Sequence, residues 1–283
     1  MSKLSMSCCA VSSSLLVSSS FGATAVALFE DFEDSTVGYT VHGFVPDVEE
    51  SGSTAGTVGA EVGEFSELSE SPVSRDYISR IAYSNTDVTD NVSGNYLIAD
   101  PLDNLGSSYF GGQDIDSVTN LEGAGFDHVA LQWTGIDVSS FGSDYSVSAF
   151  FGELGDGGNT DWDVTDRLGI WASLDSGAYV QVFNIVGIAN NSTPFVDFNL
   201  DGVKNGLDTD ITTTMTEYSA DIGSVLGAGN DLDLQIRIGN LNSPDEDIAI
   251  DNFMISGTTI PEPSSSSLLL ISACALLTRR SRR

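Results

Sequence analysis

Residues 128–136 read HVALQWTGI and residues 145–151 read YSVSAFF, and in both stretches apolar side chains alternate with small or polar ones. Alternation with period two places Val129, Leu131 and Trp133 on one face of an extended strand, and Tyr145 and Val147 on one face of another. The eight residues between the two stretches, DVSSFGSD, are typical of a turn. The pattern therefore predicts two β-strands joined by a short connection.

Similar short runs continue in both directions along the chain, and no segment has the period of an amphipathic helix. Because Trp133 and Trp171 lie within apolar runs, both indoles are expected in the core. About ten short strands with Gly-rich turns favour two packed antiparallel sheets, an all-β jelly-roll-type β-sandwich. The expected strands cover residues 28–33, 39–45, 77–83, 96–99, 108–110, 128–136, 145–151, 168–174, 178–183, 213–220, 232–238 and 248–256.

The clearest hairpin consists of LGIWASL at residues 168–174, the turn Asp175-Ser176-Gly177, and AYVQVF at residues 178–183. A three-residue bulged hairpin needs one residue with a positive φ, and glycine adopts that conformation without steric cost. The sequence therefore predicts that Gly177 supplies it.

The sandwich is predicted to span residues 28–257 as one domain, with an acidic Gly- and Ser-rich loop at residues 47–72. All 41 acidic residues lie between Glu30 and Glu262, where only five basic residues accompany them. Nucleic acid is excluded as a partner, since a phosphate backbone requires clusters of Lys and Arg. Such self-repulsion suits a saline or calcium-containing exterior, where ions screen the charges.

Residues 1–27 are predicted to form a secretory signal peptide. Lys3 is followed by a weakly apolar Ser-rich stretch, and Ala25-Val26-Ala27 has the small-x-small pattern that signal peptidase reads, with Ala25 and Ala27 as the small residues. Two of the three cysteines lie in this segment and Cys274 lies near the C-terminus, so removal of both ends would leave no disulfide.

Residues 258–283 are predicted to form a sorting tail: Pro261-Glu262-Pro263, the apolar run SSSSLLLISACALL, and a basic cluster of Arg279, Arg280, Arg282 and Arg283. Positive charge behind an apolar segment holds that end on the cytoplasmic side of a membrane. The run is shorter than the roughly 20 residues of a stable span, which suits a short transmembrane helix that anchors the chain only transiently.

Together these three features resemble the PEP-CTERM sorting tail of Gram-negative bacteria. The resemblance implies processing by an exosortase-type membrane protease, transient inner-membrane anchoring, and release or attachment at the cell surface, often in organisms that produce exopolysaccharide. Residues 126–257 also resemble a surface module of PEP-CTERM proteins, related to jelly-roll carbohydrate-binding and laminin-G-like sandwiches. That resemblance implies a surface role with no established enzymatic activity. An ordinary weak C-terminal membrane anchor is the alternative for the tail.

Residues 197–208, DFNLDGVKNGLD, have the order of a twelve-residue calcium loop, with glycine at position 6. Asp208 stands where such loops have Glu, and the flanks read as strands. A long Asp/Asn/Gly turn is the alternative. A second calcium position would lie between an acidic residue at the first strand, Glu30, Asp31 or Glu33, and Asp251 of the last strand. The candidate ligands of the loop are Asp197, Asn199, Asp201, the carbonyl of Val203, Asn205 and Asp208.

Catalysis has little support, because the sequence contains no HExxH and no GxSxG motif. Trp162, between Asp161 and Asp163, is the aromatic residue expected to contact a ligand. The predicted function is an exported, non-catalytic cell-surface or matrix protein with polysaccharide as the candidate ligand. An extracellular carbohydrate-active enzyme, a glycoside hydrolase or lyase, is the alternative.

Overall fold

The computed structural model describes residues 22–33, 38–42, 77–82, 105–106, 108–113, 129–153, 162–241 and 246–261. The strand expected at residues 96–99, the acidic loop at 47–72 and the sorting tail from Glu262 onward lie outside these ranges. Within them, the chain forms strands and one short helix, α1 (Gly223–Leu226). No helix in the described ranges has the length and apolar character needed to span a membrane. Residues Thr24 to Ile260 form one compact unit.

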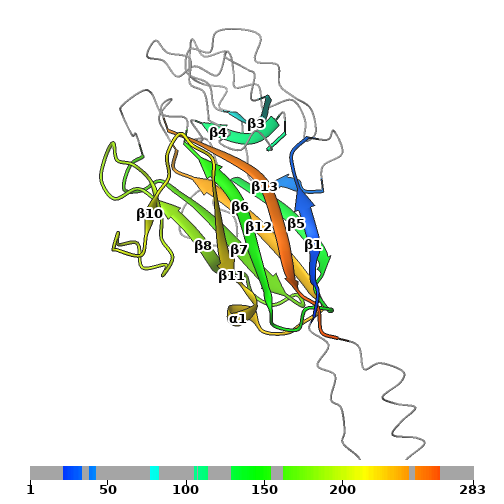
Figure 1. Ribbon diagram of the computed structural model, residues 1–283. Helices are drawn as coiled ribbons and strands as arrows, with labels where there is room; N and C mark the ends of the chain where they lie inside the picture. The colour runs from blue at the N-terminus through cyan, green and yellow to red at the C-terminus, as the bar shows by residue number, and fades with distance from the viewer. Residues whose placement is uncertain are drawn as a thin grey trace, which may run out of the picture. The chain divides into compact units, whose positions relative to one another are not determined.

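One layer of this unit is a six-stranded antiparallel sheet (Figure 1). The central strand is β13, which pairs with β6 on one side and with both β4 and β1 on the other. The strands lie in the order β11 (Thr216–Asp221), β6 (Tyr145–Gly152), β13 (Asp247–Thr258), β4 (Ser108–Gln113) and β3 (Tyr77–Ala82), with β1 (Thr24–Glu30) beside β13.

The second layer is a seven-stranded antiparallel sheet centred on β7 and β12, whose residues pair from Leu232 opposite Leu174 to Gly239 opposite Arg167. β5 extends the sheet on one side and the β7–β8 hairpin extends it on the other. The order is β10 (Thr209–Asp210), β9 (Phe195–Val196), β8 (Val180–Val186), β7 (Arg167–Leu174), β12 (Asp231–Gly239), β5 (Val129–Asp137) and β2 (Thr40–His42).

The two sheets enclose one hydrophobic core, as the period-two pattern predicts. Val129, Leu131 and Trp133 of β5 are all buried. Trp133 stacks on Phe253 of β13, with ring centroids 4.7 Å apart, and so joins the two layers. Burial of such large apolar side chains is the main favourable term in forming a sandwich. The structure thus confirms the expected antiparallel β-sandwich and the core position of Trp133.

The turn of the β7–β8 hairpin differs from the prediction. Asp175 and Ser176 have positive φ values of 50° and 62°, and the Gly177 N–H donates to the Leu174 carbonyl at 2.9 Å. A type I′ turn, in which both central residues need positive φ, therefore follows Leu174, and the connection between the two strands continues to Tyr179. The Asp175 carboxylate accepts the amides of Asn230 and Asp231, each at 3.0 Å, which holds the aspartate in this conformation.

The first strand begins ahead of the predicted domain boundary. β1 starts at Thr24, and Ala25 and Ala27 lie inside it rather than in a segment before the domain. Both alanines pack against the hydrophobic core. The folded unit also extends past residue 257, since the Ile260 N–H donates to the Ser140 carbonyl at 2.7 Å. The structure therefore places the limits of the unit at Thr24 and Ile260.

Candidate functional site

Large polar and aromatic side chains gather on the outer face of the seven-stranded sheet. On β12, Leu234 and Ile236 are buried in the core, so the alternating residues Gln235 and Arg237 belong to the opposite face. Trp171 pairs with Gln235 in the β7–β12 register, and Gly169 pairs with Arg237. We call the outward-facing group the amide–aromatic face, and it consists of Gln132, Gly169, Trp171, Tyr179, Gln181, Asn184, Gln235 and Arg237.

Arg237 is the centre of this face. Its guanidinium carbon lies 4.4 Å from the centre of the Trp171 ring and 5.4 Å from that of Tyr179. Its Nε donates to Gln235 Oε1 at 2.7 Å, and Gln235 Nε2 donates to Gln132 Oε1 at 3.0 Å. These contacts hold Arg237, which is only 2% exposed, in one conformation. Cation–π contacts with two rings also fix the positions of the rings.

Gly169 leaves space for this arrangement. A Cβ atom at Gly169 would meet Gln181 Nε2 at 2.8 Å and Trp171 Nε1 at 2.9 Å, which is closer than such atoms approach. The indole edge and the glutamine amide therefore meet above a position that has no side chain. The Trp171 Nε1 atom is buried and has no hydrogen-bond partner among the residues that the structure describes. A donor in this state costs free energy unless a partner reaches it.

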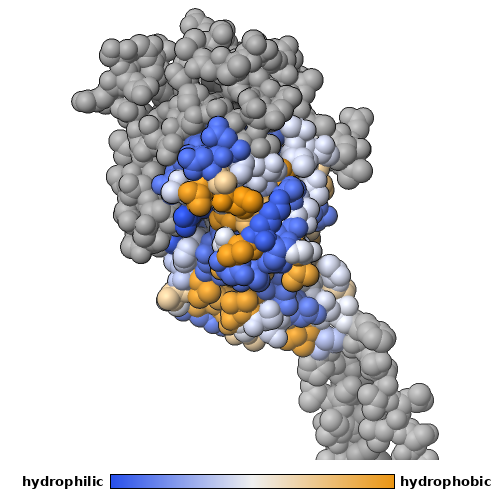
Figure 2. Space-filling view, turned by 90° about the vertical axis from the view of Figure 1, so that its left-hand side faces the viewer, coloured by the Kyte–Doolittle hydropathy of each residue, from blue (hydrophilic) through white to orange (hydrophobic). Residues whose placement is uncertain are grey.

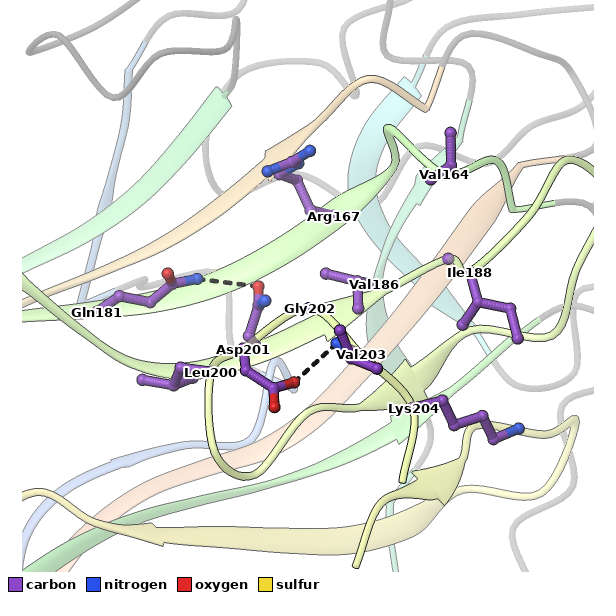
Figure 3. Close-up of a pocket in the computed structure, with 12 residues that line it drawn as sticks. Val164, Arg167, Gln181, Val186, Ile188, Leu200, Asp201, Gly202, Val203 and Lys204 are labelled. Carbon is purple, nitrogen blue, oxygen red and sulfur yellow. Dashed lines mark hydrogen bonds between the residues drawn. The ribbon is translucent and has the colours of Figure 1, made fainter. Parts of the chain in front are cut away.

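A pocket with a cavity volume of about 560 Å³ adjoins the amide–aromatic face at Gln181 and Asn184 (Figure 3). β7 and β8 contribute one wall, where Gln181 Nε2 donates to Asn184 Oδ1 at 2.9 Å. The loop at residues 197–208 contributes the other. The described lining residues are Val164, Arg167, Gln181, Asn184, Val186, Gly187, Ile188, Leu200, Asp201, Gly202, Val203 and Lys204.

Exposed aliphatic side chains surround the polar part of this pocket. Val164, Ile188, Leu200 and Val203 all line it and are all at least 40% exposed. Figure 2 shows the side of the molecule that carries β8 and β10 in Figure 1, where hydrophobic residues form patches between hydrophilic ones. An apolar lining with a few fixed polar groups is the usual composition of a small-molecule site.

The predicted calcium loop folds around Asp197. This residue is fully buried, and its carboxylate accepts the amides of Asp201 at 3.3 Å and Gly202 at 2.7 Å. Asp208 accepts the amides of Phe198 and Asn205, and the Val203 carbonyl accepts the Asn205 side chain. Asn199 Nδ2 donates to Asp201 at 2.8 Å. The loop thus has the hydrogen bonding of an Asx-rich turn.

No group of three or more His, Cys, Asp or Glu side chains in the described ranges is placed to hold a metal ion. In the second expected calcium position, Glu33 Oε1 accepts the Ser108 amide at 2.8 Å. Asp251 is fully buried in β13 and accepts the Asn252 amide at 2.7 Å. Glu30 is the last residue of β1 and pairs with Phe253, two residues after Asp251, whereas Glu33 lies beyond the end of β1.

The expectation that Trp162 faces a ligand is wrong. Its side chain is 0% exposed and belongs to the hydrophobic core, and its Nε1 donates to the Asp247 carbonyl at 2.9 Å. Burial of the indole, with a carbonyl acceptor for its N–H, outweighs the polar character of the neighbouring aspartates. The expectation that Trp171 lies in the core is wrong as well. In β7 it alternates with the buried Ile170 and Ala172 and shares its face with Gly169.

A pair of buried carboxyl groups lies beside the pocket wall. Asp166 is 0% exposed, Glu246 is 2% exposed, and the two side chains are in hydrogen-bond contact. Burial raises the pKa of Asp166 to about 7, and the negative charge of Asp163 also raises it. Hydrogen bonds with the Asp163 amide and with Glu246, and the positive charge of Arg167, lower this pKa but do not outweigh burial. Its neighbours Val164 and Arg167 line the pocket.

The sequence contained a signal for part of this site. In LDLQIRI, residues 232–238, the same alternation that buries Leu234 and Ile236 places Gln235 and Arg237 together on the other face. Gln181 and Asn184 carried no comparable signal, since their role depends on the loop at residues 197–208 that folds back over β8.

The chain matches no protein family model and no curated protein. It is similar to the K3 adhesin domain of Lys-gingipain from Porphyromonas gingivalis, with 11% identity over 82% of this chain and 100% of that domain, at a TM-score of 0.36. The mannan-recognising carbohydrate-binding module TmCBM27 is 14% identical over 66% of this chain and 100% of that module, at a TM-score of 0.29. The Stig cyclase Fisc from Fischerella sp. TAU is 11% identical over 66% of this chain and 77% of the cyclase, at a TM-score of 0.34. Similarities at these scores carry no argument about function.

Proposed function

We propose that this chain is an exported, non-catalytic cell-surface or matrix protein of a Gram-negative bacterium that binds polysaccharide. The observation that supports this is the continuity of the amide–aromatic face with the pocket through Gln181. The aromatic rings Trp171 and Tyr179 and four amide side chains stand together on one face, beside a cavity of about 560 Å³.

This set of side chains suits the chemistry of a sugar. A pyranose ring presents C–H groups on its faces, which pack on aromatic rings and aliphatic side chains. Its hydroxyls both donate and accept hydrogen bonds, and so do Gln and Asn side chains.

The pocket favours binding over hydrolysis. A glycosidase uses two carboxyl groups about 5 to 10 Å apart. Asp201 is the single carboxylate among the described lining residues, and its oxygens already accept the Val203 amide and the Asn199 side chain. Asp166 and Glu246 are buried away from a ligand. A carbohydrate-active enzyme remains the alternative that the experiment below distinguishes.

Export and sorting belong to the same proposal. Signal peptidase would remove the N-terminal segment, and an exosortase-type protease would act near Pro261-Glu262-Pro263 after transient anchoring in the inner membrane. The sequence features that support this are the small-x-small triplet Ala25-Val26-Ala27, the apolar run after Pro263 and the arginines at the C-terminus.

Calcium at residues 197–208 is a further part of the proposal. The loop already wraps around Asp197, which occupies position 1 and accepts the amides of positions 5 and 6. Each carboxylate oxygen that accepts one amide keeps a lone pair for a cation. Binding would require Asp201 and Asp208 to turn toward Asp197, because their carboxylates are not grouped with it in the structure.

The test is binding of the purified protein to a panel of neutral and acidic polysaccharides, with reducing ends measured over time. We expect retention without release of reducing ends. Replacing Gln181 and Asn184 together by alanine should weaken binding roughly tenfold, since each hydrogen bond contributes about 0.5–1.5 kcal/mol. Asn230→Ala, at an exposed amide near α1, is the matched control. Reducing ends that accumulate would favour the enzyme, and unchanged binding by the double variant would exclude this pocket.

A further inference from the structure

β1 is a complete member of the six-stranded sheet. It pairs with β13 from Thr24 opposite Thr258 to Glu30 opposite Phe253, six residue pairs in all, with a bulge between Val26 and Leu28. Figure 1 shows the strand running beside β13 over its length. The pairing joins the two ends of the folded unit, because Thr24 and Thr258 lie directly opposite each other.

The first half of β1 packs against the hydrophobic core in addition to pairing with β13. Ala25, Ala27 and Leu28 contact the hydrophobic core, whereas Val26 is more than half exposed. This alternation of core-facing and exposed residues is expected of a strand that covers a core, because one face of the strand is buried and the other meets solvent. The AVA triplet at residues 25–27 therefore has a structural explanation that is independent of any protease.

A cut after Ala27 would remove half of this strand. Three of its six pairs, those of Thr24, Ala25 and Val26, would be lost. The backbone groups of Ser256, Gly257 and Thr258 would then form an unpaired sheet edge, and the core would lose the cover of two alanines. An open edge is a liability for aggregation, and it exposes polar groups that the strand satisfied.

We infer that the exported chain keeps β1 whole and that signal peptidase hydrolyses the peptide bond between Gly22 and Ala23. This inference rests on the proposed export. Water adds its hydroxyl to the Gly22 carbonyl carbon and a proton to the Ala23 nitrogen as the C–N bond breaks. The peptidase reads an extended chain before folding, so the fold does not direct the cut. The fold decides which residues the product must retain.

Ser20-Phe21-Gly22 supplies the recognition pattern at this position. It is a small-x-small triplet that ends two residues before β1 begins. It also follows the apolar residues Leu15, Leu16 and Val17 more closely than the AVA triplet does. A leader of 22 residues is within the range of about 15 to 30 for secretory signals.

The C-terminal end of the folded unit also limits where the chain can be cut. The Thr258 N–H donates to the Asp144 carbonyl at 2.9 Å, and the Ile260 N–H donates to the Ser140 carbonyl at 2.7 Å. The Ile260 side chain lies against Gly142, where a Cβ atom would meet its Cδ1 at 2.9 Å. Processing at the C-terminal side is therefore expected beyond Ile260, so that the retained unit begins at Ala23 and includes Ile260.

N-terminal sequencing of protein recovered from the cell exterior tests the inference directly. We expect the first residue to be Ala23, and a start at Thr24 would equally preserve β1. A start at Val26 or Leu28 would overturn the inference while leaving export intact. Recovery of chains that still begin at Met1 would instead refute export, and the inference with it.

Two variants distinguish cleavage after Ser20-Phe21-Gly22 from cleavage after the AVA triplet, because the peptidase acts before the chain folds. Gly22→Leu places a large side chain at the proposed cleavage position and should cause the uncut precursor to accumulate. Ala27→Leu makes the same change at the AVA triplet and should leave processing unchanged. The opposite result, with processing blocked only by Ala27→Leu, would assign the cut to Ala27.

A stability comparison supplies a readout that does not involve the protease. Two purified chains that begin at Ala23 and at Leu28, and that end at the same residue, differ only in the first half of β1. We expect the shorter chain to melt several degrees lower, given roughly 2–4 °C per kcal/mol for a domain of this size. Equal melting midpoints would show that residues 24–27 contribute nothing to the fold and would overturn the argument.

Discussion

At the scale of single residues, Asp166 is the most unusual group in the described part of the chain. It is fully buried in contact with Glu246, and one oxygen, Oδ1, has no hydrogen-bond partner within the described ranges. Burying a carboxylate is costly, and the negative charge of Asp163 adds repulsion, so the protonated form is favoured. The pair therefore joins the segment before β7 to the segment before β13 through a contact that depends on a proton.

The free energy of unfolding should fall as the pH rises through this group. Its pKa is about 7 in the folded protein and near 4 in the unfolded chain, so the folded state binds more protons between these values. Stability from this group is complete below about pH 4 and is lost as the pH approaches and passes 7. Asp166→Asn mimics the protonated side chain and should flatten the profile between pH 5 and 8. Urea titrations at several pH values measure this, and an unchanged slope in the variant would contradict it.

Gly169 offers a second test at this scale, directed at the binding site. Gly169→Ala introduces a Cβ within 3.0 Å of both Gln181 Nε2 and Trp171 Nε1, so one of the two must move. We expect weaker polysaccharide binding with a small loss of stability, on the order of 1 kcal/mol. Gly206→Ala is the control, because a Cβ there meets nothing within 4 Å. Equal binding by the two variants would count against the amide–aromatic face.

At the scale of elements, the loop at residues 197–208 connects β9 to β10 and covers the outer face of β8. Leu200 and Gly202 have positive φ values of 59° and 72°, which let the chain turn around Asp197. The loop then contributes Leu200 through Lys204 to the pocket. Lys204, which also lies over the Phe195 ring, forms an ion pair with Asp210 that ties the loop to β10. A change that makes residues 197–208 more rigid therefore also makes this wall of the pocket more rigid.

Calcium should stabilise the protein through this loop if the proposed site is correct. A ligand that binds only the native state adds about 2.7 kcal/mol at a concentration a hundredfold above its Kd. Thermal melts in millimolar calcium, against magnesium at equal ionic strength, should show a calcium-specific rise that Asp201→Ala mostly removes. Asp144→Ala removes the same charge at an exposed position and controls for repulsion. A rise that persists in Asp201→Ala would leave residues 197–208 as a turn.

At the scale of the whole molecule, the excess of acidic residues is the dominant feature. A net charge of −31 opposes compaction and favours solubility, and salt screens it over about 10 Å or less. The basic residues Arg167, Lys204 and Arg237 all occupy the pocket or the face beside it. Three of the five basic residues between Glu30 and Glu262 thus lie where a ligand is proposed to bind.

Processing of the C-terminal tail is the prediction at this scale. Protein recovered from the native cell surface should lack Cys274 and the four terminal arginines, which intact-mass measurement detects. Replacing Pro261 and Pro263 by alanine should leave the tail attached, because the proposed recognition motif is gone. Recovery of the wild-type protein with its arginines in place would rule out sorting by this route.

Local alternation was sufficient to predict most of the described strands and which of their residues share a face. Val129, Leu131 and Trp133 share a face because successive side chains of a strand point in opposite directions, and no other part of the chain is needed to establish this. The hairpin at residues 168–183 and the all-β class followed from the same local rules. The two-residue strands β9 and β10 were missed because they are shorter than any period they could display.

The tertiary structure decided which face of each strand meets the other sheet. Trp133 and Trp171 lie in similar apolar runs, yet one is in the core and the other lies under Arg237 on the outer face. Trp162 reads as a loop residue but is buried, and Ala25 and Ala27 read as a cleavage motif but belong to β1. Period two shows which residues share a face. The choice between core and solvent depends on pairing with strands far away in the sequence, such as β1 with β13, and that pairing forms only when the sheets assemble.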